Sequence, residues 1–561
     1  MPSRSLTIFE RYSSSNGFWI VCILVASFAT VLPIALMGIP DNYDLLQHLR
    51  FARTFYGEIQ NLSISPGWAA GDNAGFGSVG VRFYPPLAYV VMAATQLITN
   101  SWFDSLWTNI LLWMFIGSLG VYFWAKEWLP APQAAMAAVL YAVVPYHLFQ
   151  VYQGFLFAEF VASAILPFCF LFAGRIVGRG RFIDVILFAI AFSALVLSHI
   201  PSTIVGSLSL AVYIAILLER RHFVRSCFGF LAAFAISLAA TSFHWVRLVT
   251  ELEWVKHNSP QFYGTGYYDY STYFFPMYFN SAEKYIQRLL WAYDITIILT
   301  ILLFIPLCVL FVSRFLSNRG RANQRHLIAL GIVGLVAFFM ASAASSFIWN
   351  SVGLLQKLQF PWRWLSVASL VGSVVFVIGI SEVSKLWPNM KRPIIYGVIS
   401  IMFAILLYDI TQQVMPSAPV SRQELSARIE KIDSEEGCAC WWPTWADSRS
   451  FQNAERVSAG SRVVEISEWR AENRKFFVAA GNETSARIAT FYYPYWKAEV
   501  NGTAAEIERA DDGTMNIPLP QTKANVRLFF SEPNFVSVAK SISLLAWIGL
   551  FLGILVFLRK R

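Results

Sequence analysis

Long apolar runs separated by short polar connections dominate the chain. Many of these runs approach the roughly 20 residues that a helix needs to cross a bilayer. We predict about 12 spans, at residues 17–38, 106–125, 133–148, 156–174, 183–199, 201–218, 226–247, 291–313, 327–347, 364–383, 394–412 and 540–558. The pattern therefore predicts a polytopic α-helical membrane protein. The composition agrees, because 56% hydrophobic residues, 14% charged residues and a mean hydropathy of +0.52 exclude an ordinary soluble protein.

Basic residues gather in the connections that fall on one side of this topology. The clusters are Arg175/Arg179/Arg181, Arg220/Arg221/Arg225, Arg314/Arg319/Arg321/Arg325, Lys385/Lys391/Arg392 and Arg559/Lys560/Arg561. Cytoplasmic connections carry an excess of Lys and Arg, so this bias places both termini in the cytoplasm. It also accounts for the formal net charge of +9, and we predict no nucleic-acid partner.

The apolar segment 86–99 tests the topology. It is short for a span and follows the paired prolines of RFYPPLAY. A full crossing would move the loop from Arg175 to Arg181 to the outside, so we interpret the segment as re-entrant or interfacial. The outer side then carries a first loop (39–105), a second loop (248–290), a short loop around FPWRW, and a large polar segment before the last span.

That polar segment has the alternating pattern of β-strands. Stretches such as SRVVEISEW and ANVRLFFSE alternate, and Asn501-Gly502 and Asp512-Gly513 supply turns between them. We predict a small β-sandwich after one helix, SRQELSARIEKI. The domain organisation is then a transmembrane domain (1–412), a mainly β extracytoplasmic domain (413–535), and a last span with a basic tail (536–561). The aromatic residues of this region are expected to form its core.

Two cysteines, Cys438 and Cys440, lie in the polar segment. A single residue separates them, so we expect no disulfide between them, and no second pair completes a zinc site. The chain also lacks a G-x-x-x-x-G-K-[ST] loop, which argues against ATP-driven transport by this chain alone.

The first candidate for chemistry follows the first span. Pro40 suits a helix start and Asp41 suits the N-cap. Asp44 and His48 are four residues apart on that helix and share a face, so a carboxylate and an imidazole would meet at the membrane surface. The pair could perform acid–base chemistry or share a metal. The alternative is a solvated surface pair without a catalytic role.

The second candidate is Arg363, in LQKLQFPWRWLS at the outer mouth of a span. A guanidinium there is suited to holding a lipid phosphate or pyrophosphate bidentately. The alternative is an arginine snorkelling within an aromatic belt. Other polar groups near outer span ends would line the same outward cavity: His147, Glu159, His199, His244, Arg247 and Glu251. Each of these, taken alone, also fits a satisfied structural residue.

Several stretches together resemble a known family. They are PDNYDLLQH, AAGDNAGFGSVGVRFYPPLAY, LQFPWRW, WWPTWAD and FYYPYWKAEVNG. In this order they are similar to bacterial membrane proteins labelled 6-pyruvoyl-tetrahydropterin-synthase-related, which resemble the GT-C superfamily of polyprenyl-phosphate-sugar-dependent glycosyltransferases. The label's pterin chemistry has no counterpart in these residues. The resemblance covers most of the chain.

The resemblance implies a catalytic base in the first outer loop. The family's acidic pattern falls on Asp44 and His48, with Asp41 as a competing base. Tyr43 stands where the pattern favours His or a small residue, which leaves a divalent metal open, and no cofactor is required by the sequence. GT-C enzymes commonly invert configuration in one displacement, so one base and one phosphate-binding group suffice.

We therefore expect a cell-envelope glycosyltransferase of the bacterial inner membrane. A polyprenyl-phosphate sugar would place its phosphate near Arg363 and Arg247, with Glu159, His199 and Tyr84 as further substrate-binding residues. The hydroxyl of a glycan, lipid or protein acceptor would lie outside, near Asp44. Two other hypotheses are a transporter or flippase of lipid-linked glycans and a non-catalytic envelope-assembly protein. A transporter would need polar groups continuing through the membrane midplane and matching repeats, neither of which the sequence has.

Overall fold

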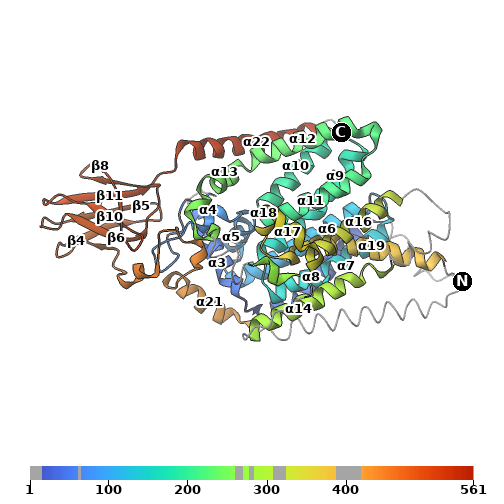
Figure 1. The fold of residues 1–561 in the computed structure, drawn as a ribbon, viewed down its shortest axis with the longest axis horizontal. Helices are drawn as coiled ribbons and strands as arrows, with labels where there is room; N and C mark the ends of the chain where they lie inside the picture. The colour runs from blue at the N-terminus through green and yellow to red at the C-terminus, as the bar shows by residue number, and fades with distance from the viewer. Residues whose placement is uncertain are drawn as a thin grey trace.

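The chain is an integral membrane protein built from a body of helices with an antiparallel β region at one end (Figure 1). The computed structural model describes residues 15–60, 65–259, 269–276, 284–306, 324–386 and 419–559. Within these ranges, eight helical stretches are long and apolar enough to cross a membrane: α2 (Asn16–Met37), α6 (Trp102–Ala125), Ala131–Gln153, α9 (Phe157–Gly178), α11 (Ile200–Leu217), Arg220–Ala240, Pro361–Ser381 and α22 (Asn534–Arg559).

All eight stretches fall at predicted spans. Three further predictions coincide with helices, α10 (Phe182–Val196), α14 (Lys284–Leu302) and α16 (Gln324–Ala341), whose apolar parts are shorter. The remaining predicted span, 394–412, lies outside the described residues. Segment 86–99 forms a separate helix, α5 (Leu87–Thr99), which at about 1.5 Å per residue is shorter than the hydrocarbon core. Its re-entrant or interfacial position stays a prediction.

The helix after the first span begins later than predicted. α3 runs Tyr43–Gln60, whereas Pro40 belongs to the two-residue strand β1 (Ile39–Pro40), which pairs with β2 (Pro419–Val420). Asp41 is therefore not the N-cap. Its carboxylate instead accepts two hydrogen bonds from Arg428, at 2.7 and 2.9 Å, so it ties the start of this region to a segment nearly 400 residues away.

The β region consists of two antiparallel sheets. One has the order β3 (Val457–Ser458), β6 (Ser485–Phe491), β10 (Thr514–Pro518), β9 (Glu508–Arg509); the other has the order β4 (Val464–Trp469), β5 (Asn473–Val478), β11 (Ala524–Phe530), β7 (Trp496–Val500), β8 (Thr503–Ala505). The Asn501-Gly502 turn is confirmed, because both residues have positive φ and join β7 directly to β8. Buried aromatic residues such as Trp442, Tyr493 and Trp496 confirm the predicted core.

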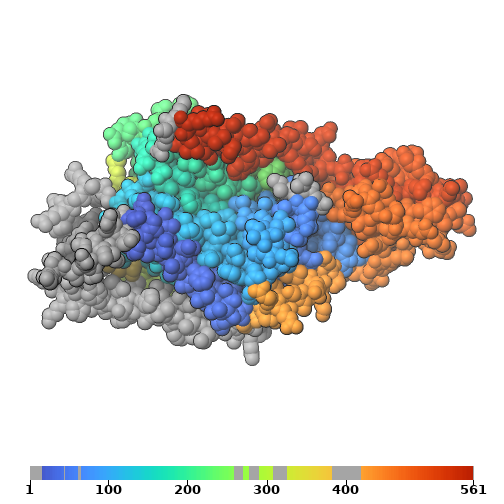
Figure 2. Space-filling view, turned by 180° about the vertical axis from the view of Figure 1, so that it is seen from behind, coloured from blue at the N-terminus to red at the C-terminus, as the bar shows by residue number. Residues whose placement is uncertain are grey.

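The segments on both sides of the β region lie against the helical body. At its C-terminal end, the chain leaves β11 and runs back beside the body as α22 (Figure 1). At its N-terminal end, the segment 419–450, which contains α21 (Arg422–Lys431), lies against the N-terminal quarter of the chain (Figure 2). Ser421 caps α21 as a helix start should, by accepting a hydrogen bond from the Glu424 amide.

One sequence prediction in this segment is wrong. Cys438 and Cys440 form a disulfide, with Cα atoms 5.2 Å apart. The single residue between them lies in a tight turn, which brings the two Cα atoms into the usual disulfide range despite their closeness in sequence.

Candidate active site

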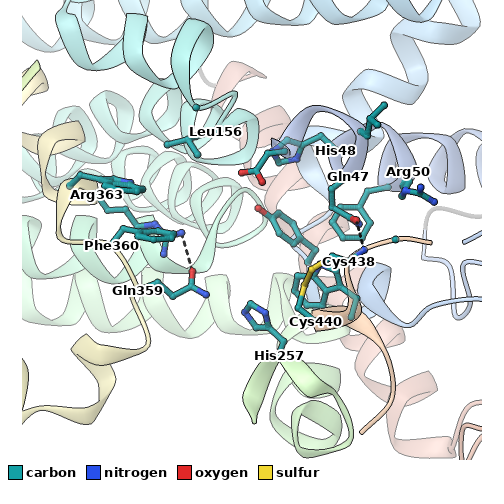
Figure 3. A pocket seen from close by; sticks show the side chains of 18 of the residues that line it. Gln47, His48, Arg50, Leu156, His257, Gln359, Phe360, Arg363, Cys438 and Cys440 are labelled. Carbon is teal, nitrogen blue, oxygen red and sulfur yellow. Dashed lines mark hydrogen bonds between the residues drawn. A yellow bond between two sulfur atoms is a disulfide. The ribbon is translucent and has the colours of Figure 1, made fainter. Parts of the chain in front are cut away.

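A cavity of about 670 Å³ lies where the helical body meets the segment after α21. Its walls come from α3, the turn at Pro361–Trp364, the turn at Lys256–Asn258, and residues 435–441. Figure 3 shows Arg363, Phe360 and Gln359 on one wall and His48 and Gln47 on the opposite wall. The lining includes Asp44, His48, Tyr84 and Arg363, so four of the predicted site residues meet in one cavity.

Asp44 presents its carboxylate to this cavity from the first turn of α3. The surrounding protein encloses the site, yet the Asp44 side chain itself remains exposed to the cavity space. Burial raises the pKa of Asp44 to about 6, against the lowering effect of the Arg363 guanidinium and with a further raising effect from Glu159. A carboxylate with this pKa is ionised at neutral pH and can still accept a proton readily, as a general base requires.

His48 lies one turn further along α3 and is only 3% exposed. Its Nδ1 lies 2.6 Å from the Tyr89 hydroxyl, and its ring packs against Tyr84, Phe155 and Phe157. Burial lowers the pKa of His48 to about 3, so the imidazole is neutral at physiological pH. The alternative of a solvated surface pair is therefore wrong for His48. Among the contacts of the described residues, no hydrogen bond joins His48 to Asp44.

Arg363 lies in the middle of the FPWRW turn and is 7% exposed. Its Nε donates to Glu159 Oε2 at 3.2 Å, one terminal nitrogen donates to the Leu358 carbonyl, and the other donates to Gln359 Oε1 at 3.3 Å. This packing excludes a snorkelling side chain. A guanidinium has five N–H groups, so two of them remain for a ligand in the cavity after these three contacts.

Glu159 and His199 lie behind the cavity wall. Glu159, in the first turn of α9, accepts from Arg363 and from the Tyr146 hydroxyl, and thereby fixes the guanidinium. His199 caps α11, with its Nδ1 2.8 Å from the Ser202 hydroxyl. Both are buried, and neither is among the lining residues. Their positions support the site without contacting its contents directly.

Arg247 and Glu251 belong to a different cluster. Both lie on α13 (Ser242–Glu251), where Arg247 donates to Glu532 at 2.5 Å and Glu251 receives a bidentate pair from Arg82 at 2.7 and 2.8 Å. We call Arg82, Arg247, Glu251, Glu532 and Lys540 the charge cluster. It joins α13 to the start of α22 and to the β region, and none of its members lines the cavity.

Several lining residues were not predicted from the sequence: Gln47, Arg50, His257, Gln359, Glu435, Glu436 and the Cys438–Cys440 pair. Arg50 explains how residues 432–436 reach the cavity. Its guanidinium donates to the carbonyls of Ile432 at 2.6 Å, Glu435 at 3.3 Å and Glu436 at 3.4 Å. The sequence around Arg50 does not predict these contacts, because the backbone carbonyls lie more than 380 residues away along the chain.

The described ranges contain no group of three His, Cys, Asp or Glu side chains arranged to hold a metal ion. Asp44 and His48 supply two possible ligands in the cavity. The same cavity also presents the buried guanidinium of Arg363 and several aromatic side chains, among them Tyr84, Phe360 and Trp362.

Comparisons with solved structures give distant likenesses. The oligosaccharyltransferase of Archaeoglobus fulgidus is 12% identical, with 75% of this chain and 57% of that chain covered and a TM-score of 0.38. ArnT from Cupriavidus metallidurans is 14% identical, with 74% and 75% covered and a TM-score of 0.38. The arabinosyltransferase EmbB from Mycobacterium smegmatis is 12% identical, with 91% and 62% covered and a TM-score of 0.36. The chain thus spans just over half of the first of these proteins.

No curated protein matches the chain. A family model does match, and it covers residues 81–417, which is more than half of the chain. The model describes the 6-pyruvoyl-tetrahydropterin synthase related domain, a membrane protein, and it confirms the resemblance found in the sequence motifs. The chain therefore belongs to the family of membrane proteins that carry the 6-pyruvoyl-tetrahydropterin synthase related domain.

Proposed function

We propose that this protein is a glycosyltransferase that moves a sugar from a polyprenyl-phosphate donor to a hydroxyl acceptor. The observation that carries the proposal is that Asp44 and Arg363 face one cavity of about 670 Å³ at the end of the helical body. The two groups match the two needs of such a transfer: a base for the acceptor and a cation for the leaving phosphate.

The donor side of the reaction rests on Arg363. Its two remaining N–H groups can hold two phosphate oxygens, and Glu159 keeps the guanidinium in place from behind. Apolar and aromatic side chains on the same wall, Phe149, Tyr273, Phe360 and Trp362, suit a ligand that joins a phosphate to a hydrocarbon chain. A buried arginine strengthens its hold on the phosphate as negative charge grows there during bond cleavage.

The acceptor side rests on Asp44. Its carboxylate takes the proton of the acceptor hydroxyl while that oxygen forms a bond to the anomeric carbon. The bond between the anomeric carbon and the phosphate oxygen breaks in the same step, and the phosphate leaves with the electron pair. Asp41 competes poorly for this role, because Arg428 occupies its carboxylate and it does not line the cavity. Neutral His48 keeps the Asp44 face of α3 packed against Tyr89.

The proposed setting is the bacterial inner membrane, with the cavity and the β region outside and both termini in the cytoplasm. The basic connections of the sequence support this orientation. Residues 435–441, which precede the β region, form part of the cavity wall, so the β region is well placed to cover the site or to bind the acceptor.

Mass spectrometry of cell-envelope glycans and lipid-linked sugars in a deletion strain tests the proposal. Complementation with wild-type protein should restore one glycosyl unit and clear the accumulated polyprenyl-phosphate sugar. Asp44→Asn protein at matched membrane levels should restore neither, whereas Asp41→Asn protein should restore most of the unit. Full rescue by Asp44→Asn would show that Asp44 is not the base. An unchanged glycan profile in the deletion strain would contradict the proposed glycosyltransferase activity.

A further inference from the structure

The segment that leads into the turn of Arg363 brings a second polar side chain to the cavity, the amide of Gln359. Gln359 is 7% exposed and lines the cavity. Its Oε1 accepts a hydrogen bond from Arg363 at 3.3 Å. Its Nε2 has no acceptor among the described residues. A buried amide donor without a partner costs free energy, and a hydrogen bond to a ligand in the cavity would recover it.

The orientation of this amide is fixed by its neighbour. A guanidinium carries only donors, so it must face the amide oxygen, and the amide nitrogen must point the other way. Figure 3 shows this arrangement, with the nitrogen turned from Arg363 toward the part of the cavity bounded by His257 and Cys440. The unpartnered donor therefore lies beside the guanidinium, on a side chain that lines the cavity.

The backbone gives no reason for glutamine at this position. Gln359 has a φ of +66°, a left-handed conformation that glycine adopts freely and that costs other residues free energy. Such strain persists only where the surroundings hold it, and it often accompanies binding sites. Trp362, on the same turn, adds another buried donor, Nε1, without an acceptor among the described residues. Gln359, Trp362 and Arg363 all line the cavity, so unpartnered donors and a guanidinium are grouped in one stretch of its wall.

We propose that Gln359 binds a phosphate oxygen of the ligand through Nε2, next to the oxygens that Arg363 holds. This inference rests on the proposed function and names how the donor's phosphate is recognised. A neutral amide beside a guanidinium adds a directional hydrogen bond without adding charge, so it fixes the orientation of the phosphate. Because Gln359 also positions Arg363, two variants are needed to separate the two roles.

Gln359→Glu keeps an oxygen toward Arg363 but replaces the free donor with an acceptor. If Gln359 only holds Arg363 in place, the carboxylate of Gln359→Glu should hold the guanidinium equally well or better. If Gln359 binds the phosphate, that carboxylate should repel the phosphate. Gln359→Gly removes the side chain and suits the positive φ, so the fold is expected to persist. Gln452→Glu, at an exposed site in the segment before the β region, controls for the change in charge.

The test is calorimetric titration of the purified full-length protein with farnesyl phosphate, inorganic phosphate and farnesol. We expect the affinity for farnesyl phosphate to fall about tenfold or more in Gln359→Glu, less in Gln359→Gly, and to stay within twofold in Gln452→Glu. Farnesol, which lacks the phosphate, should bind all four proteins equally. Unchanged affinity of Gln359→Gly for farnesyl phosphate would overturn the inference and leave the proposed function standing, because a loss confined to Gln359→Glu is explained by its added charge beside Arg363.

The other arms separate the source of the phosphate. If inorganic phosphate binds wild type as tightly as farnesyl phosphate does, and Gln359→Glu weakens both, the phosphate contact is supported but the lipid-linked donor is not. If wild type binds neither phosphate, the inference and the proposed donor site both fail.

Discussion

Two groups of buried arginines lie at the same end of the helical body, and they are built differently. In the charge cluster, Arg82 directs its Nε and both terminal nitrogens to Glu251, Glu532 and the Gly67 carbonyl. At the cavity, Arg363 has one carboxylate partner, Glu159, and faces open space. In the charge cluster, each carboxylate binds cations of the same cluster. At the cavity, part of the Arg363 guanidinium has no partner among the described residues and borders the cavity space.

The difference lies in how the charges are balanced. Although burial opposes its ionisation, Arg247, Arg82 and Lys540 hold the pKa of Glu532 down to about 2, so this carboxylate stays charged. At the cavity, the Asp44 carboxylate lacks a comparable set of cations, and its pKa rises to about 6. Carboxylates that each bind several donors hold parts of the protein together. A carboxylate without such partners can exchange protons, and a guanidinium open to a cavity can bind anions.

The largest difference expected between the two groups of arginines is that between Arg363→Gln and Arg247→Gln. Removing Arg363 should slow sugar transfer by about 10²- to 10³-fold, because the leaving phosphate loses its buried cation. Removing Arg247 should lower thermal stability but leave the rate per folded molecule within a few fold. The measurement is transfer rate and unfolding temperature on the same purified samples. Equal losses of rate in both variants would erase the distinction between the two groups.

Glu251→Gln should weaken the charge cluster and so lower the stability of the protein. Glu251 is fully buried and holds Arg82 and the Tyr493 hydroxyl, so its loss leaves a buried guanidinium partly unpaired. We expect a loss of about 3 kcal/mol in unfolding free energy. The neighbouring exposed Glu253, changed to Gln, is the matched control and should be silent in denaturant unfolding of the purified protein. An unchanged unfolding free energy for Glu251→Gln would show that the charge cluster does not stabilise the contact between α13 and the β region.

The pH dependence of transfer should report Asp44. The base works when ionised, so the rate should rise with pH through about 6, level off near 7, and fall about tenfold per unit below the pKa. Since Glu159 raises this pKa, Glu159→Gln should shift the midpoint of the profile downward. A raised carboxyl pKa favours the folded state at low pH and loses that benefit as pH rises through 6. Asp44→Asn should therefore increase stability above pH 6 relative to wild type.

The smallest expected effect concerns the disulfide in the cavity wall. Cys438 and Cys440 close a very short loop, so replacing both with Ser should cost only about 1–2 kcal/mol of stability. Arg50 and Asn73 hold the same segment by hydrogen bonds to its backbone, so the wall should stay in place. Thermal unfolding with and without a reductant checks this, and a collapse of transfer on reduction would give the disulfide a larger role.

Local patterns predicted much of this architecture. Apolar runs located the described long helices, and the Asn501-Gly502 signal located a hairpin, because these features depend on neighbouring residues. The site was only partly predictable. Asp44 and His48 share a helix face and were found by spacing, but their separation into an exposed carboxylate and a buried, Tyr89-bound imidazole depends on tertiary contacts.

Long-range partners decided the remaining assignments. Asp41 was predicted to cap a helix, but its carboxylate binds Arg428 of the distant α21 instead. Arg247 looked like a second phosphate-binding group, and Glu532 placed it in the charge cluster instead. The sequence does not predict a role for Gln359, because the proposed role rests on its positive φ and its unpartnered amide, which depend on the folded structure.

The role of Asp44 as the base is tested most directly by the single-turnover rate of sugar transfer in proteoliposomes that contain a labelled prenyl-phosphate-sugar donor. Asp44→Asn should lower this rate by about 10²- to 10⁴-fold while donor binding stays unchanged, and Asp41→Asn should remain within about tenfold of wild type. A rate for Asp44→Asn close to that of wild type, with Asp41→Asn as the inactive variant, would show that Asp41 and not Asp44 is the base.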